Sequence, residues 1–139
     1  MSYEEKGVWA YLLSSAGAYI VYLVIVVPRL FHTPAAHVPY LVPLIMSTIA
    51  SVIIATLVRS ALEVARPSDS HKADVRDREI ARFGEHASRW CVVGGATVGL
   101  IGAFDRWDYF WIANAIYLGF VLWAVVGSVL RLVAYRRGL

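Results

Sequence analysis

Charged residues and cysteines are both scarce in this 139-residue chain. Only 17% of its residues are charged, against about 25% in a soluble domain, so a soluble fold would lack the polar residues to cover its surface. The single cysteine, Cys91, excludes an internal disulfide, a paired-cysteine metal site and an intramolecular dithiol couple. No Asp, Glu, Lys, Arg or His lies in the middle of an apolar run, although proton relays and proton-coupled transporters usually need such a residue at that depth.

Apolar residues, by contrast, make up 59% of the chain and raise its mean hydropathy to +0.61. They form four long runs at about residues 7–27, 40–58, 88–105 and 109–130. A hydrocarbon core of about 30 Å needs about 20 helical residues, so three runs fit directly. The third is clearly apolar only from Trp90 to Phe104; it spans if flanking arginines snorkel to the interfaces, and a re-entrant segment is the alternative. We predict an all-α bundle of four transmembrane helices in one membrane domain, residues 1–139.

Lysine and arginine residues predict the orientation of these spans. Short loops rich in them lie in the cytoplasm. Eleven of the 13 fall in the N-terminal tail, the loop 59–87 with its flank, and the C-terminal tail; the other two are Arg29 and Arg106. We therefore expect both termini and this loop to be cytoplasmic, and the chain to be a multi-pass protein of the cell (inner) membrane.

The cytoplasmic loop 59–87 is charged but patterned. One helical face carries apolar residues spaced three or four apart: Ile80, Phe83, Ala87 and Trp90. Acid precedes base at helical spacing in three pairs, Asp74–Arg78, Glu79–Arg82 and Glu85–Arg89, each worth about 0.2–0.5 kcal/mol if formed. The pattern predicts that helix three begins in the cytoplasm as an amphipathic extension.

Small residues recur every four positions along the third run, at Gly95, Gly99 and Ala103. Such a stripe lets another helix backbone approach closely. It serves either packing inside one bundle, which we favour, or a homodimer interface.

Asn114 is the most polar residue within a span. An amide that faces lipid would be costly, so we expect it to point inward and to find a hydrogen-bond partner on the first helix. The candidates there are Ser14, Ser15, Tyr19 and Tyr22. We favour a structural link between helices over a substrate contact.

The remaining candidate residues are on the cytoplasmic side. Five in the loop are candidates for contact with a partner protein: Asp74, Arg76, Asp77, Arg78 and Arg82. Arg131, Arg136 and Arg137 have no nearby side-chain acid and are candidates for contact with anionic lipid headgroups. The four histidines lie in or near loops without metal-site spacing, so no metal, cofactor or catalytic residue is predicted, and nothing indicates nucleic-acid binding.

Three segments resemble a family of small bacterial four-helix membrane proteins of unknown function. They are Glu4-Glu5-Lys6 with Trp9, Asp74-x-Arg76-Asp77 with Ile80 and Arg82, and the stretch from Phe110-Trp111-Ile112-Ala113-Asn114 to Tyr135-Arg136-Arg137-Gly138. The family's loop tends to read Asp-Glu-Arg-Asp, whereas Val75 replaces the glutamate here. The resemblance implies this topology and a bacterial inner membrane, and it brings no activity.

We therefore expect an accessory, sensory or regulatory protein that acts through helix and loop contacts, with membrane lipids, a second copy of the chain or another protein as partners. The alternative is a small oligomeric transporter or channel for an apolar or cationic compound, which would need a polar cavity around Asn114. An enzyme is less favoured, because it would need Asp74, Asp77 and Glu79 to converge, and their spacing suits a solvated helix.

Overall fold

The computed structural model describes residues 3–65 and 75–137, which contain four long helices and no strands. They are α1 (Tyr3–Leu30), α2 (Leu41–Ala65), α3 (Val75–Phe104) and α4 (Tyr109–Arg137), with a 3-10 turn, η1 (Ala35–His37), between the first two. Each long helix is long and apolar enough to cross a membrane. The predicted all-α bundle of four membrane-spanning helices is confirmed, and the chain is a multi-pass membrane protein.

Two helices extend further than the apolar runs indicate. Helix α2 continues to Ala65, past the predicted end at residue 58, because the residues that follow are mostly good helix formers. Helix α3 begins at Val75, well before residue 88, and continues without a break for 30 residues. At 1.5 Å per residue it is about 45 Å long, which fits a span with an amphipathic extension and does not fit a re-entrant segment.

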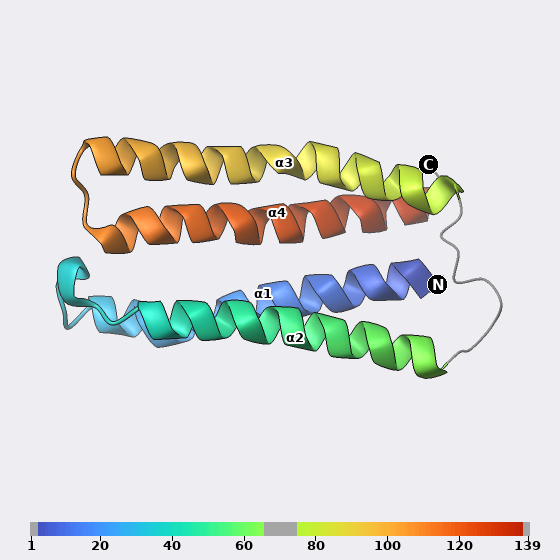
Figure 1. Ribbon diagram of the computed structural model, residues 1–139, viewed down its shortest axis with the longest axis horizontal. Coiled ribbons are helices and arrows are strands. Elements are labelled where there is room, and N and C mark those ends of the chain that lie inside the picture. The colour runs from blue at the N-terminus through green and yellow to red at the C-terminus, as the bar shows by residue number, and fades with distance from the viewer. Residues whose placement is uncertain (1–2, 66–74, 138–139) are drawn as a thin grey trace.

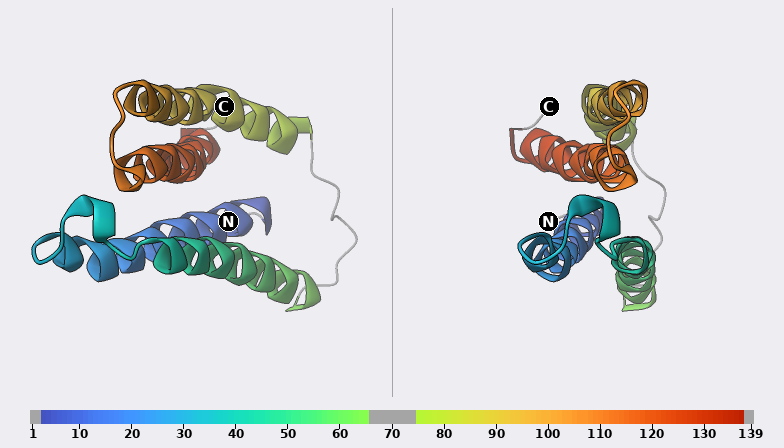
Figure 2. Two further views of the ribbon diagram at one scale, coloured as in Figure 1. Left: turned by 60° about the vertical axis from the view of Figure 1, so that its left-hand side comes forward. Right: turned by 90° about the vertical axis from the view of Figure 1, so that its left-hand side faces the viewer.

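The helices form two antiparallel hairpins, α1–α2 and α3–α4, which pack together through α1 and α4 (Figures 1 and 2). Helices α2 and α3 therefore take outer positions. Helix α1 begins and α4 ends at the same end of the bundle, which we call the terminal end; the short connections within the hairpins lie at the opposite, turn end. Toward the terminal end α1 diverges from α2 and lies between α2 and α4 (Figure 1).

The α3–α4 connection is a tight helix cap. Arg106 takes the left-handed conformation, with φ of 57°. Its N–H bonds to the Ala103 carbonyl at 3.3 Å, and the Trp107 N–H bonds to the Gly102 carbonyl at 2.8 Å, the pattern of a Schellman motif. A Cβ on Gly102 would lie 2.7 Å from the Trp107 ring, so glycine is needed for the tryptophan to fold back over the helix end.

One cluster of buried apolar residues lies at the turn end, between α1, the α1–α2 connection and α4. Its members are Tyr22, Val26, Val38 and Phe110. Most large apolar side chains of α2 are instead exposed. Lipid is the solvent that can cover such a surface, because a helix satisfies its own backbone hydrogen bonds in the hydrocarbon region.

Candidate functional site

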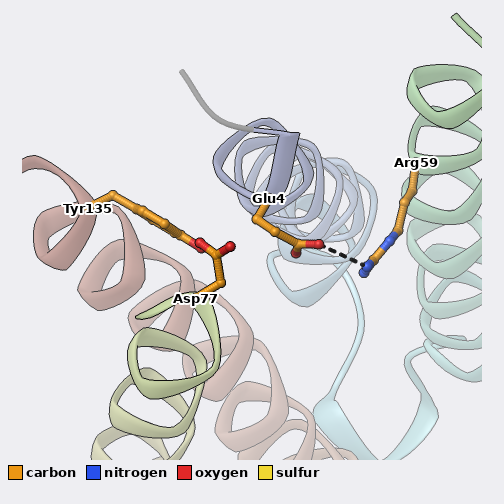
Figure 3. A network of polar contacts seen from close by, with 4 residues as sticks. All are labelled: Glu4, Arg59, Asp77 and Tyr135. Carbon is orange, nitrogen blue, oxygen red and sulfur yellow. Dashed lines mark hydrogen bonds and ion pairs between the residues drawn. The ribbon is translucent and has the colours of Figure 1, made fainter. Parts of the chain in front are cut away.

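One side chain from each helix belongs to a polar layer at the terminal end of the bundle (Figure 3). The Tyr135 hydroxyl of α4 donates a 3.0 Å hydrogen bond to Asp77 Oδ1 of α3. Glu4 Oε1 of α1 lies 3.9 Å from Arg59 Nη2 of α2. The first contact joins the helices of one hairpin and the second joins those of the other. Each of these two contacts therefore joins the helices of one hairpin, whereas the hydrogen bonds Tyr22–Asn114 and Ser47–Tyr117 join the two hairpins to each other.

A groove of about 460 Å³ lies between the two hairpins in the terminal half of the bundle. Helix α1 packs against both α2 and α4, whereas α2 and α3 do not pack along each other, so the groove opens between these two outer helices. Its volume is within the range of about 300–1,000 Å³ usual for small-molecule sites. Its lining includes charged residues (Glu4, Arg59, Glu85, Arg131), hydroxyl residues (Thr56, Ser88, Ser128) and apolar or aromatic residues (Val8, Tyr11, Val52, Ala55, Trp123, Ala124).

The polarity of the groove follows the ends of the apolar runs. Glu4 precedes the first run, Arg59 follows the second, Glu85 precedes the third and Arg131 follows the fourth. All four charged residues thus lie near one predicted boundary between water and hydrocarbon. The apolar part of the lining lies on the hydrocarbon side of that boundary. The groove therefore changes from charged to apolar in the same direction as a lipid leaflet changes from headgroups to acyl chains.

The Arg131 side chain, which lines the groove, packs beside a glycine of the neighbouring helix. A Cβ on Gly84 of α3 would lie 2.5 Å from Arg131 Cγ and 3.0 Å from Arg131 Nε, so the arginine side chain occupies the space that a larger residue would fill. Arg131 Nε is buried and has no hydrogen-bond partner among the residues that the structure describes. The predicted headgroup set is thereby divided, because Arg136 and Arg137 are exposed at the end of α4.

The small-residue stripe of α3 faces α4 of the same chain. A Cβ on Gly95 would lie 2.7 Å from Gly119 Cα, and one on Gly99 would lie 2.7 Å from the Ile116 side chain. Ala103 is exposed, so the close contact does not continue to it. Gly95 and Gly99 are therefore used inside the bundle, and a homodimer would need another surface.

Asn114 lies in a polar and aromatic cluster between three helices. The Tyr22 hydroxyl of α1 donates to Asn114 Oδ1 at 2.6 Å, and Asn114 Nδ2 donates to the Phe110 carbonyl at 2.8 Å. Tyr117 of α4 shares a 2.8 Å hydrogen bond with Ser47 of α2. The amide oxygen and nitrogen each have a partner, and Asn114 does not line the groove. The geometry is that of a link between helices.

The candidate partner-binding residues of the loop are divided by the structure. Arg76, Arg78 and Arg82 are exposed at the start of α3. Asp77 is half-buried and accepts the hydrogen bond from Tyr135, so it supports the fold of the hairpin. Asp74 lies outside the described residues.

Two of the three expected acid–base pairs lie wholly within the described residues, and neither forms. The side chains of Glu79 and Arg82, and those of Glu85 and Arg89, are not within the 4.0 Å of an ion pair, so the prediction of these two pairs is wrong. Exposed pairs gain about 0–1 kcal/mol and must order two long side chains. Glu85 instead lines the groove.

The carboxylates that an enzyme would need do not converge among the described residues. Asp77 is directed to Tyr135 and Glu79 is exposed. Residues two apart on a helix do not face each other, so these two cannot share a substrate.

No group of three or more His, Cys, Asp or Glu side chains that could hold a metal ion occurs in ranges 3–65 and 75–137. His32 and His37 are exposed at the turn end. No protein family, curated protein or solved structure matches the chain. The geometry therefore carries the functional argument.

The groove was not predicted from the sequence. Glu4, Arg59 and Glu85 are each the kind of charged residue that ends an apolar run, and each alone indicates only the membrane boundary. The sequence does show that these residues lie at a similar depth on their helices. It does not show which helices are neighbours, and that knowledge is needed to see that the residues line one site.

Proposed function

We propose that this chain is an accessory membrane protein of sensory or regulatory type. It binds an amphiphile in the groove between its hairpins and acts on a partner protein through the charged terminal end. The observation that carries the proposal is the groove, with charged residues from all four helices at its mouth and an apolar interior. Sites of this composition bind ligands that have one polar and one apolar part.

The two-hairpin architecture offers a way to transmit occupancy. A ligand in the groove contacts α2 on one side and α3 and α4 on the other. The Glu4–Arg59 and Tyr135–Asp77 contacts each join the helices of one hairpin, and the side-chain hydrogen bonds between the hairpins lie beyond the groove, at Tyr22–Asn114 and Ser47–Tyr117, so we propose that the terminal ends of the hairpins separate about these links. Such a shift would move the start of α3, with the exposed side chains of Arg78 and Arg82. A ligand changes this equilibrium only if it binds the two arrangements differently.

Transport is the less favoured function. A transporter would need a polar path across the bundle near Asn114, yet that amide is bonded to Tyr22 and Phe110. The groove is confined to the terminal half. An oligomer would have to supply the remaining path.

We also propose that the terminal end is cytoplasmic, in a bacterial inner membrane, with membrane lipids and a cytoplasmic or membrane protein as partners. The support is the placement of 11 of 13 lysines and arginines. Reporter fusions after Leu139 and within 69–72 should read cytoplasmic, and a fusion within 33–37 should read periplasmic. A periplasmic signal from the C-terminal fusion would refute the orientation.

Filling the groove tests the binding function. Ala55 of α2 lines the groove, whereas Ala50 on the same helix is exposed and does not. We expect Ala55→Trp to lose molecules that the wild type and Ala50→Trp retain on purification in mild detergent, as measured by native mass spectrometry. The same comparison should reduce co-purification of the partner protein from cells. Equal retention by both variants would show that the groove is not the binding element.

A further inference from the structure

The charges at the mouth of the groove divide into a neutralised pair and two separate groups. Glu4 and Arg59 lie within ion-pair distance of each other. Arg131 and Glu85 also line the groove, and no described residue lies within ion-pair distance of either. Arg131 Nε is buried beside Gly84, so the terminal guanidinium nitrogens are the groups that Arg131 can offer to a ligand. The mouth thus offers one cationic donor and one carboxylate acceptor to a ligand.

The hydroxyl groups of the lining do not compete for this role. Ser88 donates to the Gly84 carbonyl, Ser128 to Ala124 and Thr56 to Val52, each within its own helix. The protons of these three hydroxyl groups are used within their own helices, and Arg131 is the cationic donor of the lining that has no carboxylate within ion-pair distance among the described residues. Guanidinium groups bind phosphate with charge-assisted and often bidentate hydrogen bonds.

The apolar part of the groove indicates where the ligand comes from. Val52 and Ala55 form one wall and Trp123 and Ala124 form another. Helices α2 and α3 leave the groove open between them, on a side that faces lipid in a four-helix membrane bundle. A soluble ligand would leave this apolar surface uncovered, whereas an acyl chain would cover it.

Resting on the proposed function, we infer that the ligand is a membrane phospholipid with a zwitterionic headgroup that carries a primary ammonium. Its phosphate accepts hydrogen bonds from Arg131, and its ammonium donates to Glu85. A purely anionic headgroup would bring negative charge to Glu85, and a purely cationic one would bring positive charge to Arg131. A trimethylammonium headgroup has the right charges but no N–H to donate.

The test offers the full-length protein three lipids with identical acyl chains. Vesicles contain equal amounts of dioleoyl phosphatidylethanolamine, phosphatidylglycerol and phosphatidylcholine, and native mass spectrometry measures which lipid stays bound after mild detergent extraction. We expect phosphatidylethanolamine to be enriched about tenfold, the effect of one charge-assisted hydrogen bond. Arg131→Gln should abolish the enrichment, and Glu85→Gln should remove the discrimination against phosphatidylglycerol. Arg89→Gln, which changes an exposed arginine of α3 outside the lining of the groove, should behave as the wild type.

Each other outcome decides a separate point. Lipid retained without headgroup preference, or a preference that survives Arg131→Gln, would overturn this inference and leave the proposed function standing. Lipid retained no better by the wild type than by Ala55→Trp would overturn both. Displacement of the lipid by millimolar O-phosphoethanolamine, which has the headgroup without the chains, would overturn the lipid source. Thermal melting of each variant shows whether it folds. If Arg131→Gln does not fold, Glu85→Gln, at an exposed position, still tests the headgroup preference. Unchanged discrimination against phosphatidylglycerol in Glu85→Gln would overturn the inference.

Discussion

The close approach of α3 and α4 at Gly95 gives a prediction with an internal control. A Cβ on Gly95 would lie 2.7 Å from Gly119 Cα and 2.8 Å from the Ala115 carbonyl oxygen. Both are backbone atoms, so no side chain can move aside and the helices must separate. The adjacent Gly94 has nothing within 4 Å of the same position. Gly95→Ala and Gly94→Ala therefore change the same helix by the same group and differ in what that group meets.

The expected magnitude follows from two opposing effects. Replacing glycine by alanine inside a helix stabilises it by about 1 kcal/mol, and this applies to both variants. Overpacking a close contact costs about 1–3 kcal/mol, and this applies to Gly95→Ala alone. The free energies of unfolding of the two variants should thus differ by about 1–3 kcal/mol. At about 2–4 °C per kcal/mol for a chain of this size, Tm should differ by roughly 2–12 °C.

The measurement is thermal unfolding in one mild detergent, followed by circular dichroism, with light scattering to give the mass of each variant. We expect Gly95→Ala to melt lowest, Gly94→Ala at or above the wild type, and all three to have the same mass. Gly119→Ala should match Gly95→Ala, because its Cβ would lie 2.9 Å from Gly95 Cα. If Gly95→Ala melts as high as Gly94→Ala, α3 does not pack on α4 at this glycine. A change of mass confined to Gly95→Ala would place the stripe between two copies.

Two further predictions concern the polar links and the start of α3. Tyr22→Phe removes the hydrogen bond to Asn114 and should lower the free energy of unfolding by about 0.5–1.5 kcal/mol. Tyr109→Phe, at a residue 84% exposed, should leave it unchanged. Equal melting temperatures of the two variants would show that the Tyr22 hydroxyl does not link the helices. Reversing Arg76 and Arg78 to Glu should change stability by about 0–1 kcal/mol and abolish co-purification of the partner protein, and an unchanged set of bound proteins would remove the partner-binding role of α3.

The helical spans could be predicted because hydropathy is a local property. Runs of apolar residues must be helical in lipid, since no water is present to satisfy the backbone, and each run is visible without knowledge of its neighbours. The early start of α3 was visible for the same reason. The face that packs was not, because Phe83, Ala87 and Trp90 are exposed and the buried residues beside Ile80 are Gly84 and Ser88. The exact ends were not, because charged helix formers continue a helix beyond the membrane as readily as they end the apolar run.

Neighbour relations, by contrast, were decided only by the tertiary structure. The spacing of Gly95 and Gly99 indicates a close helix contact in the same way whether the partner is α4 or a second chain. Arg131 was grouped with Arg136 and Arg137 by charge and position alone; in the structure its side chain packs beside Gly84 of α3 and lines the groove, which neither of the other two does. Residues that line one site from four helices share no sequence pattern, because the pattern of each helix records its own faces and not which helix lies opposite.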